Sequence, residues 1–249
     1  MVKHRLLQPY WLGPGLRERN VDMRSIKCFF LVLTGFLLSC SDDEGQLDIF
    51  TLTYDFNSDE GSWTPGFTDY PIPETPEDTE IYDWAYYYGD TAKASNGRKV
   101  VMLTCNNVNG DVFMFLKKKV EGLKPNTRYN LIFDISVATN AISGEGVILK
   151  VGGSDLEPKT IIENNYYTLN LDKGNSLNSG ESLISLGDCG AITTAYEYLE
   201  KNNGAYLYPL LAMTNSKGEL WLIVGTDSLR EGYNVVLYSR INVVFSVSE

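Results

Sequence analysis

The sequence predicts an all-β protein, an antiparallel β-sandwich of the jelly-roll type that carries one short helix. Three observations lead to this prediction. From Ile49 onward, apolar and polar residues alternate with a period of two or form short apolar runs, as they do in strands. Breaks rich in Gly, Asn and Pro separate these segments. No series of long helical patterns alternates with them, which argues against a parallel sheet covered by helices.

The N-terminal region has the layout of an export signal, so we expect it to lie outside the fold. Residues 23–39 combine a short basic start with an apolar run from Cys28 to Leu38. The run is well short of the roughly 20 residues that a transmembrane helix needs. We interpret residues 1–22 as a mis-assigned extension, and a longer basic start to the signal is the alternative.

The end of this signal resembles the lipobox of bacterial lipoproteins, because it reads Leu37-Leu38-Ser39-Cys40. The resemblance implies cleavage before Cys40 and lipidation of that cysteine. Residues 40–48 would then form an acidic tether, in which Ser41-Asp42-Asp43-Glu44 resembles the tag that sends lipoproteins of Bacteroidota to the cell surface; a flexible acidic linker would look the same. The implied location is the outer membrane, with the protein held by its lipid anchor and facing the cell exterior.

The charge and composition of residues 40–249 exclude several functions. This part has 15 Lys and Arg against 30 Asp and Glu, a formal charge of −15. We expect no nucleic-acid partner, because such a surface repels phosphates. The only histidine, His4, lies in the leader, so the remaining chain cannot build a Ser-His-Asp or Cys-His system or a His-ligated metal site.

Residues 49–249 are expected to form a single β-sandwich domain, because no internal repeat or long linker divides them. A turn at Leu123-Lys124-Pro125-Asn126-Thr127 suits the geometry that Pro and Asn favour. One helix is predicted over Ala191–Asn202, stopped by Gly204. The expected strands lie at residues 49–56, 99–105, 112–116, 129–137, 147–151, 166–171, 219–224 and 235–247.

Cys105 and Cys189 are the cysteines that remain besides Cys40. Export would permit a disulfide, but their separation in sequence does not show whether they meet. A bridge and two buried free thiols stay open as alternatives.

Three short motifs resemble galactose-binding-like and carbohydrate-binding jelly rolls. They are Tyr54-Asp55-Phe56-Asn57 followed by Trp63, the turn from Leu123 to Tyr129, and the closing segment from Tyr238 to Val243. The resemblance implies that the first and last strands pair and often share a structural calcium ion. This chain departs from the pattern at Ser239, where such modules commonly carry Asp. The longer pattern also resembles a group of uncharacterised bacterial secreted proteins, which implies no activity.

The segment from Gly61 to Asp90 is unusually aromatic, and we take it as the candidate ligand site. Exposed Trp and Tyr rings can stack on sugar rings, while neighbouring carboxylates and amides bind sugar hydroxyls. The alternative is that rings such as Trp63, Phe67 and Trp84 plug the sandwich. Together with an acidic residue expected in a loop between two strands, the predicted ligand-binding residues are Trp63, Tyr70, Trp84, Tyr86, Tyr88 and Asp227.

A second motif, with Asp55, Asn57 and Asp59, has the alternating oxygen ligands of a calcium loop. It departs from the EF-hand pattern, since the Gly falls one place late and Gly66 stands where the final Glu belongs. A polar turn is the alternative. A structural calcium ion therefore stays open, and no other cofactor is expected.

We expect a lipid-anchored surface protein that binds a glycan through exposed aromatic rings, and the sequence favours a non-catalytic role. A glycoside hydrolase or polysaccharide lyase that uses carboxylates, or Tyr and Lys, is the first alternative. It predicts a deep cleft with two facing acids, and Glu181 and Asp188, expected in a loop, are candidates; a solvated loop without catalytic function is the alternative. The second alternative is a structural or adhesive module that contacts another protein through an exposed apolar patch.

Overall fold

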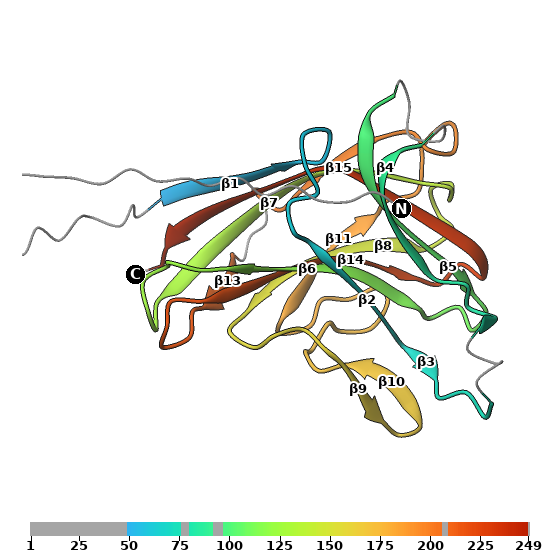
Figure 1. Ribbon diagram of the computed structural model, residues 1–249, viewed down its shortest axis with the longest axis horizontal. Helices are drawn as coiled ribbons and strands as arrows, with labels where there is room; N and C mark the ends of the chain where they lie inside the picture. Colours follow the sequence, from blue (N-terminus) through green and yellow to red (C-terminus); the bar gives the residue numbers. More distant parts are fainter. Residues whose placement is uncertain (1–48, 76–79, 92–96, 206–208, 249) are drawn as a thin grey trace, which may run out of the picture. The chain divides into compact units, whose positions relative to one another are not determined.

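The computed structural model describes residues 49–75, 80–91, 97–205 and 209–248 (Figure 1). The leader, Cys40 and the acidic tether lie outside the described residues. Within the described ranges, no helix has the length and apolar character required to cross a membrane.

Sheet A, the larger of two main sheets, contains seven strands. Five of them follow in the order β12-β7-β15-β5-β4, and β1 and β13 lie off this path. The long strand β15 pairs with β5 through its first half and with β1 through its second half, and β13 pairs with the first part of β7. The strands of sheet A are β1 (Ile49–Asp55), β4 (Ala85–Asp90), β5 (Lys99–Asn107), β7 (Arg128–Thr139), β12 (Leu199–Asn202), β13 (Leu210–Met213) and β15 (Gly232–Val247).

Sheet B has five antiparallel strands in the order β11-β8-β14-β6-β2. A small third sheet, sheet C, has the order β3-β10-β9. The strands of these two sheets are β2 (Thr64–Thr68), β3 (Tyr70–Pro71), β6 (Phe113–Val120), β8 (Val147–Ser154), β9 (Thr160–Glu163), β10 (Tyr166–Leu169), β11 (Leu183–Asp188) and β14 (Leu220–Ser228).

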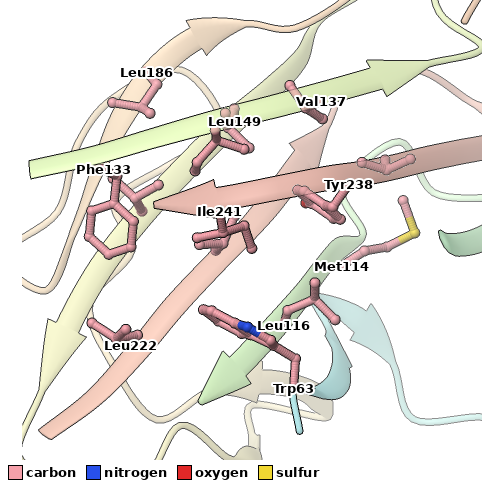
Figure 2. Packing of buried hydrophobic residues seen from close by; sticks show 14 of the residues in the cluster. Trp63, Met114, Leu116, Phe133, Val137, Leu149, Leu186, Leu222, Tyr238 and Ile241 are labelled. Carbon is pink, nitrogen blue, oxygen red and sulfur yellow. The ribbon is translucent and has the colours of Figure 1, made fainter. Parts of the chain in front are cut away.

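The core lies between sheets A and B. On β7, alternate residues Phe133, Ile135 and Val137 are fully buried, and Leu222 and Val224 are buried in the same way on β14. Figure 2 shows side chains of both sheets interdigitating in this cluster. Burial of alternate side chains on facing sheets is what a sandwich requires, so the predicted all-β fold class is confirmed.

The first and last strands pair, as the resemblance implied. The register runs from Ile49 opposite Ser246 to Asp55 opposite Arg240. Figure 1 shows β1 (blue) beside the C-terminal part of β15 (red). This pairing brings the start of the domain next to its end.

The prediction of a helix over Ala191–Asn202 is wrong. The chain there makes bends and a turn and then enters β12, whose residues Leu199 to Asn202 pair with β7. Tyr196 and Tyr198 pack on a small apolar cluster on the outer face of sheet A. The segment has few apolar residues, so a helix would bury little, whereas a strand satisfies the backbone groups at the edge of β7.

Cys105 and Cys189 are both buried free thiols, so no disulfide joins them. The Cys189 Sγ lies 3.2 Å from the carbonyl oxygen of Val147 and donates a hydrogen bond to it. The structure thus favours the second of the two alternatives that the sequence left open.

Candidate ligand-binding site

The aromatic segment closes one edge of the sandwich. Five rings pack against one another with centroid separations of 4.6 to 5.6 Å, which is the range of favourable aromatic pairs. They come from β2 and β3, from the residues before β4, and from β10, and we call them the aromatic edge cluster. Its members are Phe67, Tyr70, Tyr82, Trp84 and Tyr167.

Burial corrects the expectation that Trp63 and Tyr70 present ring faces to a ligand. Trp63 is 2% exposed and Tyr70 is 7% exposed, because both rings fill space between the sheets (Figure 2 for Trp63). Trp84, Tyr86 and Tyr88 are partly buried and pack against the same core.

The Tyr86 hydroxyl donates a hydrogen bond to Glu60. Burial, and after it this hydrogen bond, raises the pKa of Tyr86 above the usual tyrosine range. Burial also raises the pKa of Tyr70, to about 12. Both rings are therefore neutral and held in place. Among the described residues of the segment, one ring counts as exposed, that of Tyr87, whose hydroxyl donates to the Asp90 carbonyl.

Asp227 is also in a different place from the one predicted. It lies within β14 and is fully buried on the outer face of sheet B, so it is neither in a loop nor exposed. Its Oδ2 is 2.5 Å from Lys173 Nζ and 3.5 Å from Lys150 Nζ. Asp69 pairs with the same Lys173 at 2.8 Å, and burial raises the pKa of Asp69 against the opposing effect of that lysine. A buried carboxylate needs such partners, and here they hold neighbouring chain segments together.

The calcium motif forms hydrogen-bonded turns. Asp55 Oδ1 accepts the Asn57 backbone N–H at 3.0 Å, and Asp59 Oδ1 accepts the Gly61 N–H at 2.6 Å. Asn57 Oδ1 accepts the Lys99 N–H at 3.3 Å. Within the part of the chain that the structure describes, no three His, Cys, Asp or Glu residues are grouped to hold a metal ion.

Asp188 and Glu181, the candidate catalytic residues, both take part in local hydrogen bonds. Asp188 accepts hydrogen bonds from the backbone N–H groups of Gly144 and Gly190, and so ties two loops together. Glu181 is exposed, and its backbone N–H donates a hydrogen bond to Asp172 Oδ2. The described contacts do not bring Glu181 and Asp188 together as a facing pair.

A polar surface that the sequence did not predict crosses the outer face of sheet A. Strand register aligns Glu200, Ser136, Arg240 and Asp55 in one row across β12, β7, β15 and β1. All four point away from the core, because their strand neighbours such as Ile135 point into it. We call this line the first polar row.

A second polar row lies two residues away from the first on each of these strands. It contains Asn202, Asp134, Asn242 and Thr53. Arg240 links the rows, since its Nη2 is 2.9 Å from Glu200 Oε2 and 3.0 Å from Asp134 Oδ2. Asn242 Nδ2 also donates to Asp134 Oδ2, at 3.2 Å. Glu200, Arg240, Asp134 and Asn242 therefore form one connected network across the two rows.

The surface is hollowed where β15 changes partner. Up to Tyr238 this strand pairs with β5, and from Arg240 it pairs with β1, with a bulge at Ser239 between them. A partly enclosed depression of about 180 Å³ lies there. Its lining residues are Asp55, Asn57, Arg98, Lys99, Ser136, Glu200, Ser239 and Arg240.

The depression joins residues from five separate parts of the sequence, which explains why inspection of single segments missed it. A partial signal exists in the last strand, where polar Ser239, Arg240 and Asn242 interrupt an otherwise apolar run. Asp55 and Asn57 were singled out, but for a metal ion. The structure places them at the rim of a site with three cationic side chains.

Comparisons with known proteins find only solved structures with low sequence identity and low TM-scores. No protein-family model matches the chain, and no curated protein matches it. A proposed sugar-binding protein from Bacteroides thetaiotaomicron is 10% identical, with a TM-score of 0.41 over 76% of this chain and 88% of that one. A carbohydrate-binding module that recognises mannan is 14% identical, with a TM-score of 0.34 over 78% and 97% of the two chains.

The enzymatically active domain of a tailspike protein from bacteriophage CBA120 is also similar in part. It is 8% identical with a TM-score of 0.34, and the match covers 76% of this chain but only 20% of the tailspike chain. At these identities and TM-scores, the likenesses decide nothing about the ligand. The fold assignment depends on the strand pairing described above.

Proposed function

We propose that this domain binds a glycan without catalysing a reaction, and that it does so at the depression on sheet A. The observation that carries the proposal is that all eight residues lining one hollow of the sheet are polar. Guanidinium and ammonium groups donate hydrogen bonds, and carboxylate, amide and hydroxyl oxygens accept them. A sugar ring, with several hydroxyls that donate and accept, matches such a mixed lining.

The size of the depression supports a small binding unit. Its volume of about 180 Å³ is below the roughly 300–1,000 Å³ typical of sites for drug-sized ligands. One sugar ring or a chain end is therefore the unit we expect it to hold. Because the expected aromatic platform is largely buried, binding depends on hydrogen bonds more than on ring stacking.

The same geometry supports binding over hydrolysis. A glycosidase must hold sugar on both sides of the bond between two working carboxyl groups. Here the two acids of the depression already have partners, since Asp55 accepts the Asn57 N–H and Glu200 pairs with Arg240. The hollow is also too small to enclose two rings.

A glycan panel tests this function on the full-length protein in detergent. We expect the wild type to retain particular glycans, and Glu200→Ala to weaken their binding about tenfold, the effect of losing a charged hydrogen-bond partner. Glu163→Ala, which removes an exposed glutamate of sheet C, is the matched control and should bind as the wild type does. Retention of no glycan, or unchanged binding by Glu200→Ala, would contradict the proposal.

We further propose that Cys40 carries a lipid that anchors the protein in the outer membrane, with the domain facing the exterior. The motif from Leu37 to Glu44 supports this location. The intact mass of the native protein should show an acylated N-terminal cysteine, and Cys40→Ala should move the protein out of the membrane fraction. An unmodified thiol at that position, or a retained leader, would refute the anchor.

A further inference from the structure

We infer that the depression on sheet A selects a glycan with one anionic group, a carboxylate or a sulfate, and that Arg98 and Lys99 bind this group. The inference rests on the proposed function and names its ligand class. It follows from how the charges of the depression are already paired.

Arg240 is the cation that the protein itself neutralises. Its Nη2 contacts Glu200 Oε2 at 2.9 Å and Asp134 Oδ2 at 3.0 Å, and both acids belong to the polar rows. These two carboxylates more than balance one guanidinium. Arg240 therefore serves to position the rows, and its charge is already balanced within the protein.

Arg98 and Lys99 are in the opposite situation. Both residues are exposed, and neither forms a salt bridge with any acid in residues 49–75, 80–91, 97–205 and 209–248. The Lys99 ammonium lies 5.9 Å from the centre of the Tyr88 ring, and the Lys99 backbone N–H bonds to Asn57. Two adjacent cations thus line the depression without a carboxylate partner.

Tyr198, whose pKa responds to the charge of Arg98, is a neutral neighbour of that residue. Burial raises the pKa of Tyr198 to about 12, although the charge of Arg98 acts in the opposite direction. Its hydroxyl is a buried group with no hydrogen-bond partner among the described residues. A neutral phenol beside Arg98 leaves the guanidinium available for an incoming anion.

The lining favours charged over neutral recognition. It contains no aromatic ring, so stacking on a sugar face is not available inside the hollow. Hydrogen bonds that involve an ionised group are roughly twice as strong as neutral ones, and an arginine fork fits the oxygens of a carboxylate or a sulfate. An anionic substituent would therefore gain most from Arg98 and Lys99, while sugar hydroxyls meet Asp55 and Ser239.

The charge of the whole chain limits how many anionic groups the ligand carries. Residues 40–249 have a formal charge of −15, which repels an extended polyanion. A local pair of cations on an acidic surface suits an isolated acidic group on a neutral glycan. A polymer with a charge on every residue does not fit this surface.

Calorimetric titration of the full-length protein in detergent tests the inference. Three probes share one neutral oligosaccharide backbone and end in a uronic acid, a sulfated sugar or a neutral sugar. We expect the wild type to bind one of the charged probes about tenfold or more tightly than the neutral probe. The stronger of the two charged probes identifies the source of the anionic group. Arg98→Ala and Lys99→Ala should lower the ratio of the affinities for the charged and the neutral probe towards one, with little change in the affinity for the neutral probe.

Arg128→Ala is the matched control, because Arg128 is another exposed arginine of sheet A but does not line the depression. It should keep the full preference for the charged probe. Reducing the uronic acid to its alcohol should abolish the preference in the wild type, a readout that does not depend on any variant folding.

Equal binding of charged and neutral probes by the wild type would overturn the anionic ligand but leave the proposed glycan site standing. A preference that survives Arg98→Ala and Lys99→Ala would also overturn it, as would tighter binding of a long polyuronate than of the singly charged probe. Binding of none of these probes would count against both proposals.

Discussion

Lys150 is a lysine with no exposed side-chain surface, and its contacts explain how the fold accommodates it. It lies on the outer face of β8, where its Nζ donates to the carbonyl oxygens of Lys173 at 2.8 Å and Asn178 at 2.9 Å. Burial lowers the pKa of Lys150, while the charge of Asp227 opposes that change. The ammonium therefore fastens the segment after β10 to sheet B.

Lys150→Met should lower the free energy of unfolding by about 3–5 kcal/mol, the usual loss when one partner of a buried ion pair is removed. Denaturant titration measures the change. Lys159→Met is the control, because Lys159 is 59% exposed and its pair with Glu157 is worth about 1 kcal/mol or less. If both variants lose the same small amount, Lys150 does not hold this segment.

The two core cysteines should not react with alkylating reagents in the folded protein. Burial raises the pKa of both Cys105 and Cys189 to about 12, so each stays a protonated thiol near neutral pH, and the thiolate is the reactive form. Mass spectrometry after alkylation should find both unmodified in buffer and modified in denaturant. Rapid labelling of either residue in the native state would contradict this burial.

Among the strands, β15 shows how one extra residue changes the use of an element. Tyr238 and Ile241 both point into the core although they are three residues apart, because the bulge inserts Ser239. The alternation of residues predicts the strand but not this change of phase. The polar rows and the depression both depend on it.

The edge strand β2 depends on the absence of a side chain at Gly66. A Cβ there would lie 2.2 Å from Cζ of Phe115, whose ring covers the glycine. Gly66→Ala should therefore cost about 1–3 kcal/mol in unfolding free energy through displacement of that ring. Gly204→Ala, where the nearest atom is 3.6 Å away, is the control and should change stability far less. Equal stability of the two variants would show that Phe115 moves without cost.

For the whole molecule, several buried tyrosines predict alkaline unfolding. Burial raises the pKa of Tyr54, Tyr70 and Tyr198 to about 12, while in the unfolded chain tyrosine has a pKa of about 10. Between these values the unfolded chain releases protons that the folded protein retains. The stability contributed by these groups is thus fully present below pH 10 and is lost as the pH rises towards 12.

Denaturant titrations at a series of pH values from 9 to 12 check this expectation, together with the ultraviolet absorbance of ionised tyrosine. Tyr198→Phe should make the loss of stability between pH 10 and 12 less steep, because it removes one of the shifted groups. A stability that is constant over this range would contradict the expectation.

Features of the fold that depend on local pattern and composition could be predicted from the amino-acid sequence. Alternating residues predicted most of the long strands, and their number and turns predicted the sandwich. The position of the only histidine, His4, ahead of the proposed cleavage site led to the expectation that the domain uses no histidine-based chemistry. The same reasoning failed for residues 191–202, where weak local preference gave way to pairing with β7.

Which polar and aromatic groups face solvent could be seen only once the strands were paired and packed. Trp63 and Tyr70 lie in the core, Asp227 belongs to a buried ion network, and Arg240 lies in the polar rows of sheet A. The physical reason is that a residue's face follows from its own strand, but its burial and neighbours follow from strands distant in sequence. Register between β1, β7, β12 and β15 arises from their mutual packing, and no local segment encodes it.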